Sequence, residues 1–397
     1  MHPEPDTATP DPGAPPALAR RLERVAPFLA MDVLAAAATR ERQGGSVIHM
    51  EVGQPSAPAP RAAREAARAA LEAGRIGYTE ALGIAPLRER IARHYRTAYG
   101  VVVEPERVVV TTGSSAGFLL AFLSLFDAGD RVAITAPGYP AYRNILRALD
   151  LEPVAIPLRR ADGWRLTAEG LARAHAERPL RGLLAMSPSN PSGTMIGRSA
   201  LSDLGAFCRR SGLHFVSDEI YHGLSYGEPA ATALESDPDA VVINSFSKYY
   251  CMTGWRVGWM VVPDRLVRPI ERLAQNLYIS APFLSQVAAA AAFDAGEELE
   301  AVKAGYARNR AILLGELPGL GFGDLHPVDG AFYVYADASR FTNDSASFCR
   351  RALEEAGVAM TPGLDFDPAE GSHTLRLSFA GSEEDCREAV RRLRAWL

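Results

Sequence analysis

Between about residues 61 and 296, short apolar runs alternate with amphipathic segments, and this alternation limits the possible folds more than any other feature. The runs have the length of buried strands, and the amphipathic segments have helical spacing. Strands that are apolar on both faces predict an α/β fold, with a mostly parallel sheet and helices on both faces. The predicted strands are 108–112, 131–135, 153–158, 182–186, 214–218, 241–245 and 258–262, and the predicted helices are 62–72, 84–98, 115–126, 166–175 and 200–210.

The pattern changes after residue 297. Helices are predicted at 297–317, 345–356 and 382–397, and strands at 331–335, 358–361 and 374–379. We therefore predict a large domain at 61–296 and a smaller α+β domain formed by 21–60 and 297–397. Residues 1–20 are rich in proline and have no apolar core of signal-peptide length, which predicts a disordered tail.

Composition narrows the functional classes. The net charge of -5 gives no electrostatic reason to expect nucleic acid as a partner, and no apolar stretch is long enough to predict a membrane span. The four cysteines are scattered without the spacing of metal ligands, so reduced thiols are expected and no metal site is predicted. These features are typical of a cytoplasmic protein.

Polar residues follow several predicted strands, at the sheet edge where α/β proteins bind ligands. Lys248 comes just after the run 241–245, and a desolvated lysine can form a Schiff base with an aldehyde. Asp218 ends another run, where it either caps the next helix or keeps a pyridine nitrogen protonated. Tyr221 follows three residues later, within reach of a phenolic oxygen on the same ring. The structural alternative for Lys248 is a surface lysine in a loop.

Two further segments have the features of an anion site and of a rigid turn. The sequence Gly113-Ser114-Ser115 joins a strand to a helix, where free N–H groups and the helix dipole favour phosphate. Arg256 adds a fixed charge suited to two phosphate oxygens. Asn190 lies in the turn 187–194, where it either serves the turn alone or holds a hydrogen bond to a ring oxygen.

Two residues near the ends of the chain suit substrate binding. Gly53 lies in a turn, where the lack of a side chain would let a ligand approach the backbone closely. Arg376 lies between Leu375 and Leu377 in a predicted strand and points to the opposite face. Its guanidinium is well shaped to bind a carboxylate through two hydrogen bonds, and a solvated arginine is the alternative.

In this order and at these spacings, the motifs resemble those of the fold-type I pyridoxal-phosphate aminotransferases, the class I/II branch in particular. The resemblance extends over roughly residues 20–397. It implies a ping-pong transfer of an amino group between an L-amino acid and a 2-oxo acid. One departure is the run 362–367, where Asp367 replaces a glycine that is usual in the family. The strongest matches are 187–194, 217–221, 245–248, 256–258 and 375–378.

The resemblance also implies how the cofactor, pyridoxal 5′-phosphate, is bound. Lys248 would hold it covalently and act as the general base. Asp218 would pair with the ring nitrogen, and Tyr139 would stack on the ring. The ring oxygen would be held by Asn190 and Tyr221, and the phosphate by Ser114, Ser115, Ser245 and Arg256.

For the substrate, the resemblance implies that Arg376 binds the carboxylate, with Asn190 and the backbone at Gly53 close by. Tyr78 would reach the phosphate of the neighbouring subunit, which implies a homodimer with shared active sites. The residues leave the amino donor and the acceptor open. Phe28 and Leu29 match the segment that often lines the side-chain pocket in the family, and they favour an apolar or aromatic side chain.

Other activities share these motifs. A lyase or a cyclising enzyme would use Lys248, Asp218 and Arg376 in the same way and differ in how the carbanion reacts. A transcription regulator with an aminotransferase-like sensor domain would need an added DNA-binding module, and the Pro-rich residues before the fold do not fit one. A cofactor-free relative is disfavoured because every polar residue that the site requires is present.

Overall fold

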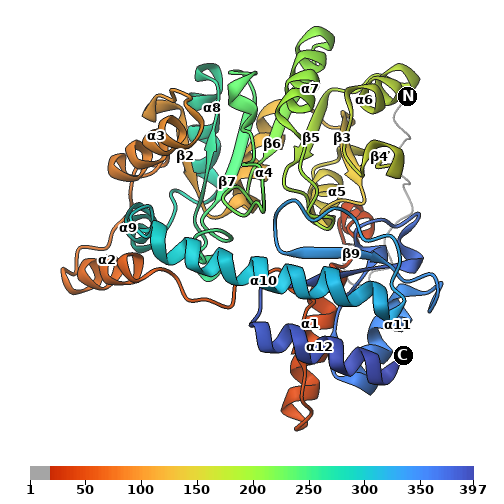
Figure 1. Ribbon diagram of the computed structural model, residues 1–397. Helices are drawn as coiled ribbons and strands as arrows, with labels where there is room; N and C mark the ends of the chain where they lie inside the picture. The colour runs from red at the N-terminus through yellow and green to blue at the C-terminus, as the bar shows by residue number, and fades with distance from the viewer. Residues whose placement is uncertain (1–17) are drawn as a thin grey trace, which may run out of the picture.

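The computed structural model describes residues 18–397, so most of the predicted tail at 1–20 lies outside the described residues. Its centre is a seven-stranded sheet of order β2-β8-β7-β6-β5-β3-β4 (Figure 1). The five strands from β3 to β7 pair in parallel, whereas β8 is antiparallel to both of its neighbours. The strands are β2 (Val108–Thr111), β3 (Arg131–Ala136), β4 (Glu152–Pro157), β5 (Gly182–Met186), β6 (His214–Asp218), β7 (Val241–Ser245) and β8 (Gly258–Val261).

Both faces of this sheet are covered, as the apolar strands predict. In β7, the side chains of Val241 and Ile243 pack into one core and that of Val242 into another, because neighbouring residues point to opposite faces. The helices that pack on one face are α4 (Ser114–Leu125), α5 (Pro140–Ala148) and α8 (Asp264–Leu277). The helices on the other face are α3 (Ala85–Tyr99), α6 (Ala168–Glu177), α7 (Arg198–Ser211) and α9 (Phe283–Ala292), with α2 (Arg61–Glu72) packed on α9.

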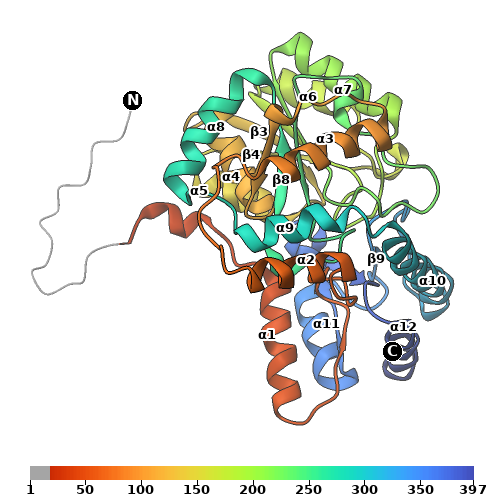
Figure 2. The same cartoon turned by 90° about the vertical axis from the view of Figure 1, so that its left-hand side faces the viewer.

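The two ends of the chain build a second, smaller unit below the sheet, in which α1 lies beside α11 (Figure 2). The pair β1–β10 joins the N-terminal segment to the C-terminal region, and β11, β12 and β9 form an antiparallel sheet. These contacts support the predicted domain division, which stays a prediction. The elements are α1 (Leu29–Arg42), β1 (Ile48–His49), α10 (Gly296–Leu320), β9 (Tyr333–Asp337), α11 (Ser345–Arg351), the π-helical turn η6 (Ala352–Ala356), β10 (Val358–Ala359), β11 (Thr361–Pro362), β12 (Thr374–Ser378) and α12 (Glu383–Trp396).

Two predicted strands differ from the structure by more than one residue at an end. The strand predicted at 331–335 begins two residues later, because Ala331 has a left-handed backbone (φ 57°) and its N–H bonds to Leu224 instead of to a strand neighbour. The strand predicted at 358–361 is two strands with different partners, since β10 pairs with β1 and β11 with β12. The four cysteines are free and buried, as expected for reduced thiols.

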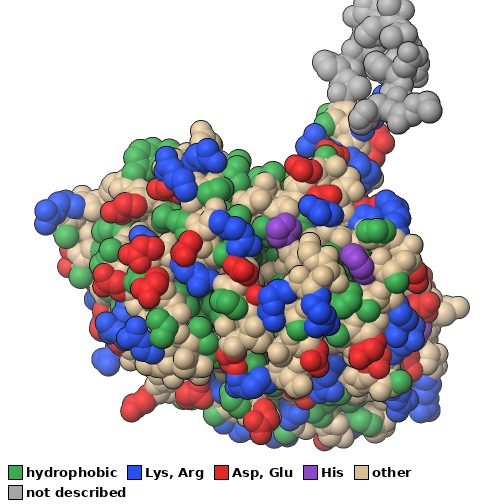
Figure 3. Space-filling model, turned by 90° about the horizontal axis from the view of Figure 1, so that it is seen from above, with side chains coloured by type: hydrophobic (Ala, Val, Ile, Leu, Met, Phe, Trp, Pro, Cys, Tyr) green, Lys and Arg blue, Asp and Glu red, His purple; other side chains and the backbone are tan. Residues whose placement is uncertain are grey.

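The surface gives two further observations. On the face seen in Figure 3, acidic and basic side chains are intermixed, and that face has no extended patch of one sign. Within residues 18–397, no helix has the length and apolar character needed to cross a membrane.

Candidate active site

A cleft of about 860 Å³, measured out to its mouth, lies at the carboxyl ends of the parallel strands, where the smaller unit meets the sheet. Ten of the predicted site residues line it. They come from distant parts of the chain, and the two that are furthest apart, Gly53 and Arg376, are separated by 323 positions. The residues are Gly53, Ser114, Ser115, Tyr139, Asn190, Asp218, Tyr221, Lys248, Arg256 and Arg376.

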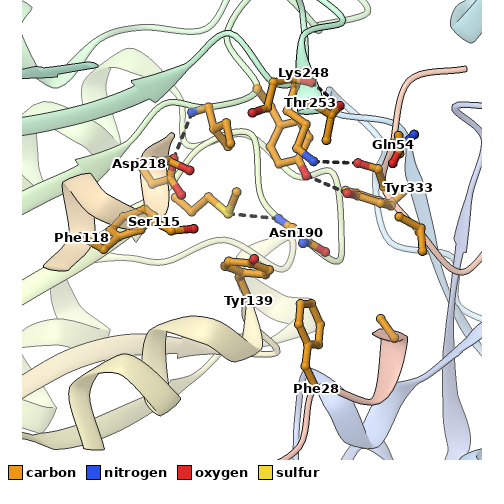
Figure 4. A pocket seen from close by; sticks show the side chains of 18 of the residues that line it. Phe28, Gln54, Ser115, Phe118, Tyr139, Asn190, Asp218, Lys248, Thr253 and Tyr333 are labelled. Carbon is orange, nitrogen blue, oxygen red and sulfur yellow. Dashed lines mark hydrogen bonds between the residues drawn. The ribbon is translucent and has the colours of Figure 1, made fainter. Parts of the chain in front are cut away.

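Lys248, just beyond β7, points into the cleft, where its Nζ donates a hydrogen bond of 2.6 Å to the carbonyl of Gly53 (Figure 4). Burial lowers the pKa of this ammonium to about 8, and Arg376 and Arg256 add to the effect, whereas Asp218 opposes it. A lysine with this pKa is partly neutral near pH 8 and can act as a nucleophile or base. The chain has only one other lysine, Lys303, which lies on α10 beside Glu300.

Asp218, at the end of β6, is fully buried. It accepts hydrogen bonds from the hydroxyl of Tyr142 and from the N–H of Ile220 (3.0 Å). Burial raises the pKa of Asp218 to about 6, while those hydrogen bonds and Lys248 hold it lower than burial alone would. The carboxyl is therefore ionised at neutral pH and can stabilise a positive charge on a ligand. The sequence interpretation missed Tyr142, which lies in the first turn of α5 and whose ring meets that of Tyr139 edge to face.

Arg376 on β12 is buried, and its guanidinium lies 4.4 Å from the ring centre of Tyr333 and 4.7 Å from that of Phe366. One nitrogen donates to Asn190 Oδ1 (2.9 Å) and another to the carbonyl of Glu51. Among the described residues, the Nε of Arg376 has no hydrogen-bond partner. The two rings and two acceptors fix the orientation of this charge at the cleft, where it can bind a carboxylate.

Tyr221 and Tyr333 both line the cleft and are hydrogen-bonded to each other, with 2.6 Å between their hydroxyl oxygens. A Cβ on residue 53 would lie 1.6 Å from the hydroxyl of Tyr333. Tyr333, a residue that the sequence interpretation missed, therefore requires glycine at this position, and the approach of a ligand to this backbone stays a prediction.

The first turn of α4 forms the other end of the cleft. Gly113 precedes it with φ 77°, and no side chain caps the helix, so its first N–H groups face the cleft. The guanidinium of Arg256 lies against Gly113, where a Cβ would come within 2.4 Å of Nη2. Free N–H groups, the hydroxyls of Ser114 and Ser115 and this guanidinium together form a cradle for an anion.

Three predicted residues, Ser245, Tyr78 and Leu29, do not line the cleft. Ser245 is buried behind it, and its hydroxyl lies within hydrogen-bonding distance of Ser247 Oγ (2.9 Å) and of the carbonyl of Val257 (3.2 Å). Ser247, two residues further along the same turn, lines the cleft in its place. Tyr78 lies in the connection between α2 and α3 and is 84% exposed.

The chain is similar to known proteins over this whole arrangement. The profile of aminotransferase class I and II matches residues 46–393. A valine–pyruvate aminotransferase of Mycobacterium tuberculosis is 50% identical over 94% of this chain and 97% of its own. An arginine–pyruvate transaminase of Pseudomonas aeruginosa is 34% identical over 92% of this chain and 93% of its own. The crystal structure of an aminotransferase from Mycobacterium tuberculosis superposes with a TM-score of 0.93 at 49% identity, covering 96% of this chain and 99% of that one.

Proposed function

This chain belongs to the class I and II aminotransferases, and from that premise we propose that it uses pyridoxal 5′-phosphate bound at Lys248. It is a transaminase that moves an amino group between an amino acid and a 2-oxo acid. The relatives favour transamination over the alternative of a lyase or cyclising enzyme, and no feature of the described residues favours that alternative.

The single observation that carries the cofactor proposal is the fit of the cleft to the three functional groups of pyridoxal phosphate. The cradle formed by Gly113, Ser114, Ser115 and Arg256 suits the phosphate. The buried carboxylate of Asp218 suits a protonated ring nitrogen, and the partly neutral amine of Lys248 suits the aldehyde. We assign Tyr139, which also lines the cleft, to the face of the ring.

The catalytic roles follow from these positions. When bound, the cofactor supplies an electron-withdrawing ring that acidifies the alpha carbon of the substrate. Asp218 keeps the proton on the ring nitrogen, and Asn190 and Tyr221 orient the ring. Lys248 would hold the aldehyde carbon of the cofactor until the amino group of the substrate takes its place, and its free Nζ would then take the proton from the alpha carbon and deliver it to that former aldehyde carbon. Arg376 holds the substrate carboxylate, so that the alpha carbon stays within reach of Lys248.

We propose a donor with an uncharged, apolar side chain and pyruvate as the acceptor. Phe28, Ala30 and Met31 form the wall of the cleft next to Tyr139. The relative of 50% identity acts on valine and pyruvate, which agrees with an apolar wall. In this scheme Arg376 binds the alpha-carboxylate of the substrate and Arg256 binds the phosphate of the cofactor. Neither of these two arginines, which line the cleft, is then left to bind a carboxylate on the donor side chain.

We also propose a homodimer in the cytoplasm. Ser115 and Arg256 are exposed at the phosphate end of the cleft, and the exposed Tyr78 of a second copy would cover it. Four free cysteines suit a reducing compartment.

The test is to record the absorbance of the purified protein with pyridoxal phosphate while single amino acids are added without an acceptor. Valine and similar apolar donors should convert the bound cofactor to its aminated form, and pyruvate should restore the original spectrum. Conversion by aspartate but not by valine would overturn the proposed donor. The variant Arg376→Lys should need about tenfold more donor, while its cofactor affinity stays unchanged.

A further inference from the structure

The first turn of α1 is one wall of the cleft. Phe28 and Ala30 line it, and Met31 stands at its mouth, half exposed. The ring of Phe28 meets that of Tyr139 edge to face, with 5.8 Å between the ring centres (Figure 4). The position of this turn therefore sets the space next to Tyr139.

The helix has no N-cap of its own, because the residue at that position is Phe28. A carboxylate from the other end of the chain satisfies its first N–H groups instead. Asp365 Oδ1 accepts from the N–H of Leu29 and Oδ2 from that of Ala30, both at 3.1 Å. Asp365 is only 1% exposed, so neither bond has much competition from water.

The backbone around Asp365 is fixed by other parts of the cleft. Its carbonyl accepts a hydrogen bond from Arg143, a buried residue on α5, the helix that follows Tyr139. The next residue, Phe366, packs on the guanidinium of Arg376. The backbone that carries this carboxylate is thus anchored to the helix that begins directly after Tyr139 and, through Phe366, lies beside Arg376.

We propose that Asp365 is a positioning residue for substrate specificity. By capping α1, it holds Phe28 against Tyr139 and so forms the apolar wall that receives a donor side chain larger than a methyl group. This inference rests on the proposed function and names the residue that sets its side-chain preference.

The chain offers a matched control in the same loop. Asp367 is also buried, and its Oδ1 accepts from the N–H groups of Ala369 (3.0 Å) and Glu370 (3.1 Å), so it caps a local turn and not α1. Asp365→Asn and Asp367→Asn remove the same charge from positions two residues apart. A third variant, Phe28→Ala, removes the wall and leaves the cap intact.

The test has two measurements on the holoenzyme. Hydrogen–deuterium exchange at the start of α1 should be about fivefold faster in Asp365→Asn and unchanged in Asp367→Asn, because the amide nitrogen of asparagine cannot accept the second of the two capping bonds. In the donor half-reaction, the concentration of valine needed for half-maximal rate should rise about fivefold in Asp365→Asn and in Phe28→Ala. The maximal rate with valine should stay within about twofold of the wild type. With alanine as the donor, both the half-maximal concentration and the maximal rate should also stay within about twofold.

The proposal would be overturned if hydrogen–deuterium exchange at the start of α1 in Asp365→Asn were as slow as in the wild type. It would also be overturned if Asp365→Asn raised the half-maximal concentrations of valine and alanine equally, or if Asp367→Asn changed exchange and the valine requirement as Asp365→Asn does. If the wild type rejects valine, the proposed donor is wrong. The comparison is then made between its best donor and alanine, and the exchange measurement stays valid.

Discussion

Burial acts in opposite directions on the two titratable groups at the centre of the cleft. It raises the pKa of Asp218 to about 6 and lowers that of Lys248 to about 8, because both lose the water that stabilises their charged forms. In the range between these values, the carboxyl is ionised and part of the lysine population is neutral. Both are the forms that the proposed roles require.

The hydroxyl of Tyr142 tunes the acid side of this range. It donates to the carboxylate of Asp218 and stabilises the charged form, so Tyr142→Phe should raise the pKa of Asp218. The acid limb of kcat/KM should then move to higher pH, by about one pH unit. The control is Tyr335→Phe, which removes a buried hydroxyl that bonds to Thr374 away from the cleft. An unchanged acid limb in Tyr142→Phe would argue against Asp218 as the group that limits activity at low pH.

At this scale, the sequence predicts residues whose chemistry is unusual for their position and misses those that act through tertiary contacts. Lys248 and Asp218 stand out because charged groups follow buried strands. Tyr333 and Phe366 look like ordinary core aromatics, and their contacts with Arg376 exist only after β12 has paired with β9 and with β11. Ser245 and Ser247 are alike in sequence, and only the turn decides which one faces the cleft.

Among the elements of the cleft, the turn from β2 into α4 has the strictest requirement for one residue type, which is glycine at position 113. Gly113 has a left-handed backbone and leaves no room for a Cβ beside Arg256. We expect Gly113→Ala to weaken pyridoxal phosphate binding at least about tenfold, since it displaces the guanidinium and strains the turn. Gly129→Ala is the control, because Gly129 also has a left-handed backbone (φ 88°) but no atoms near its Cβ position. Equilibrium binding to the cofactor-free proteins checks this, and equal affinities for the two variants would contradict the phosphate assignment.

The sequence predicts elements best where a single partner determines them. Three strands of the central sheet, β5, β6 and β7, have the predicted bounds, because their apolar runs are buried on both faces. Helices α1, α5, α8 and α9 were not predicted; in α9 a run of alanines weakens the amphipathic pattern, and in α8 a proline, Pro269, lies inside the helix. The strand predicted at 358–361 failed for a different reason, because the two sheets that divide it are formed by residues distant in sequence.

At the scale of the whole molecule, the account requires a second copy of the chain. Tyr78→Ala and Lys248→Ala should each be nearly inactive alone, because the first lacks the tyrosine that reaches the phosphate of the neighbouring subunit and the second lacks the lysine that holds the cofactor and acts as the base. When they are coexpressed, each mixed dimer has one site with both wild-type residues, so about a quarter of the wild-type activity should return. Tyr78 is highly exposed in the single chain, so its substitution should not disturb the fold. Activity no greater than the mean of the two parents would place Tyr78 outside the site.

The central claim is that Lys248 holds the cofactor, and the scarcity of lysine makes it directly testable. The measurement is reduction of the pyridoxal phosphate complex with borohydride, followed by peptide mass spectrometry. The account predicts about one label per chain, on Lys248, with Lys303→Ala labelled like the wild type and Lys248→Ala unlabelled. A label on Lys303 or on the α-amino group in the wild type, or a label retained in Lys248→Ala, would contradict it.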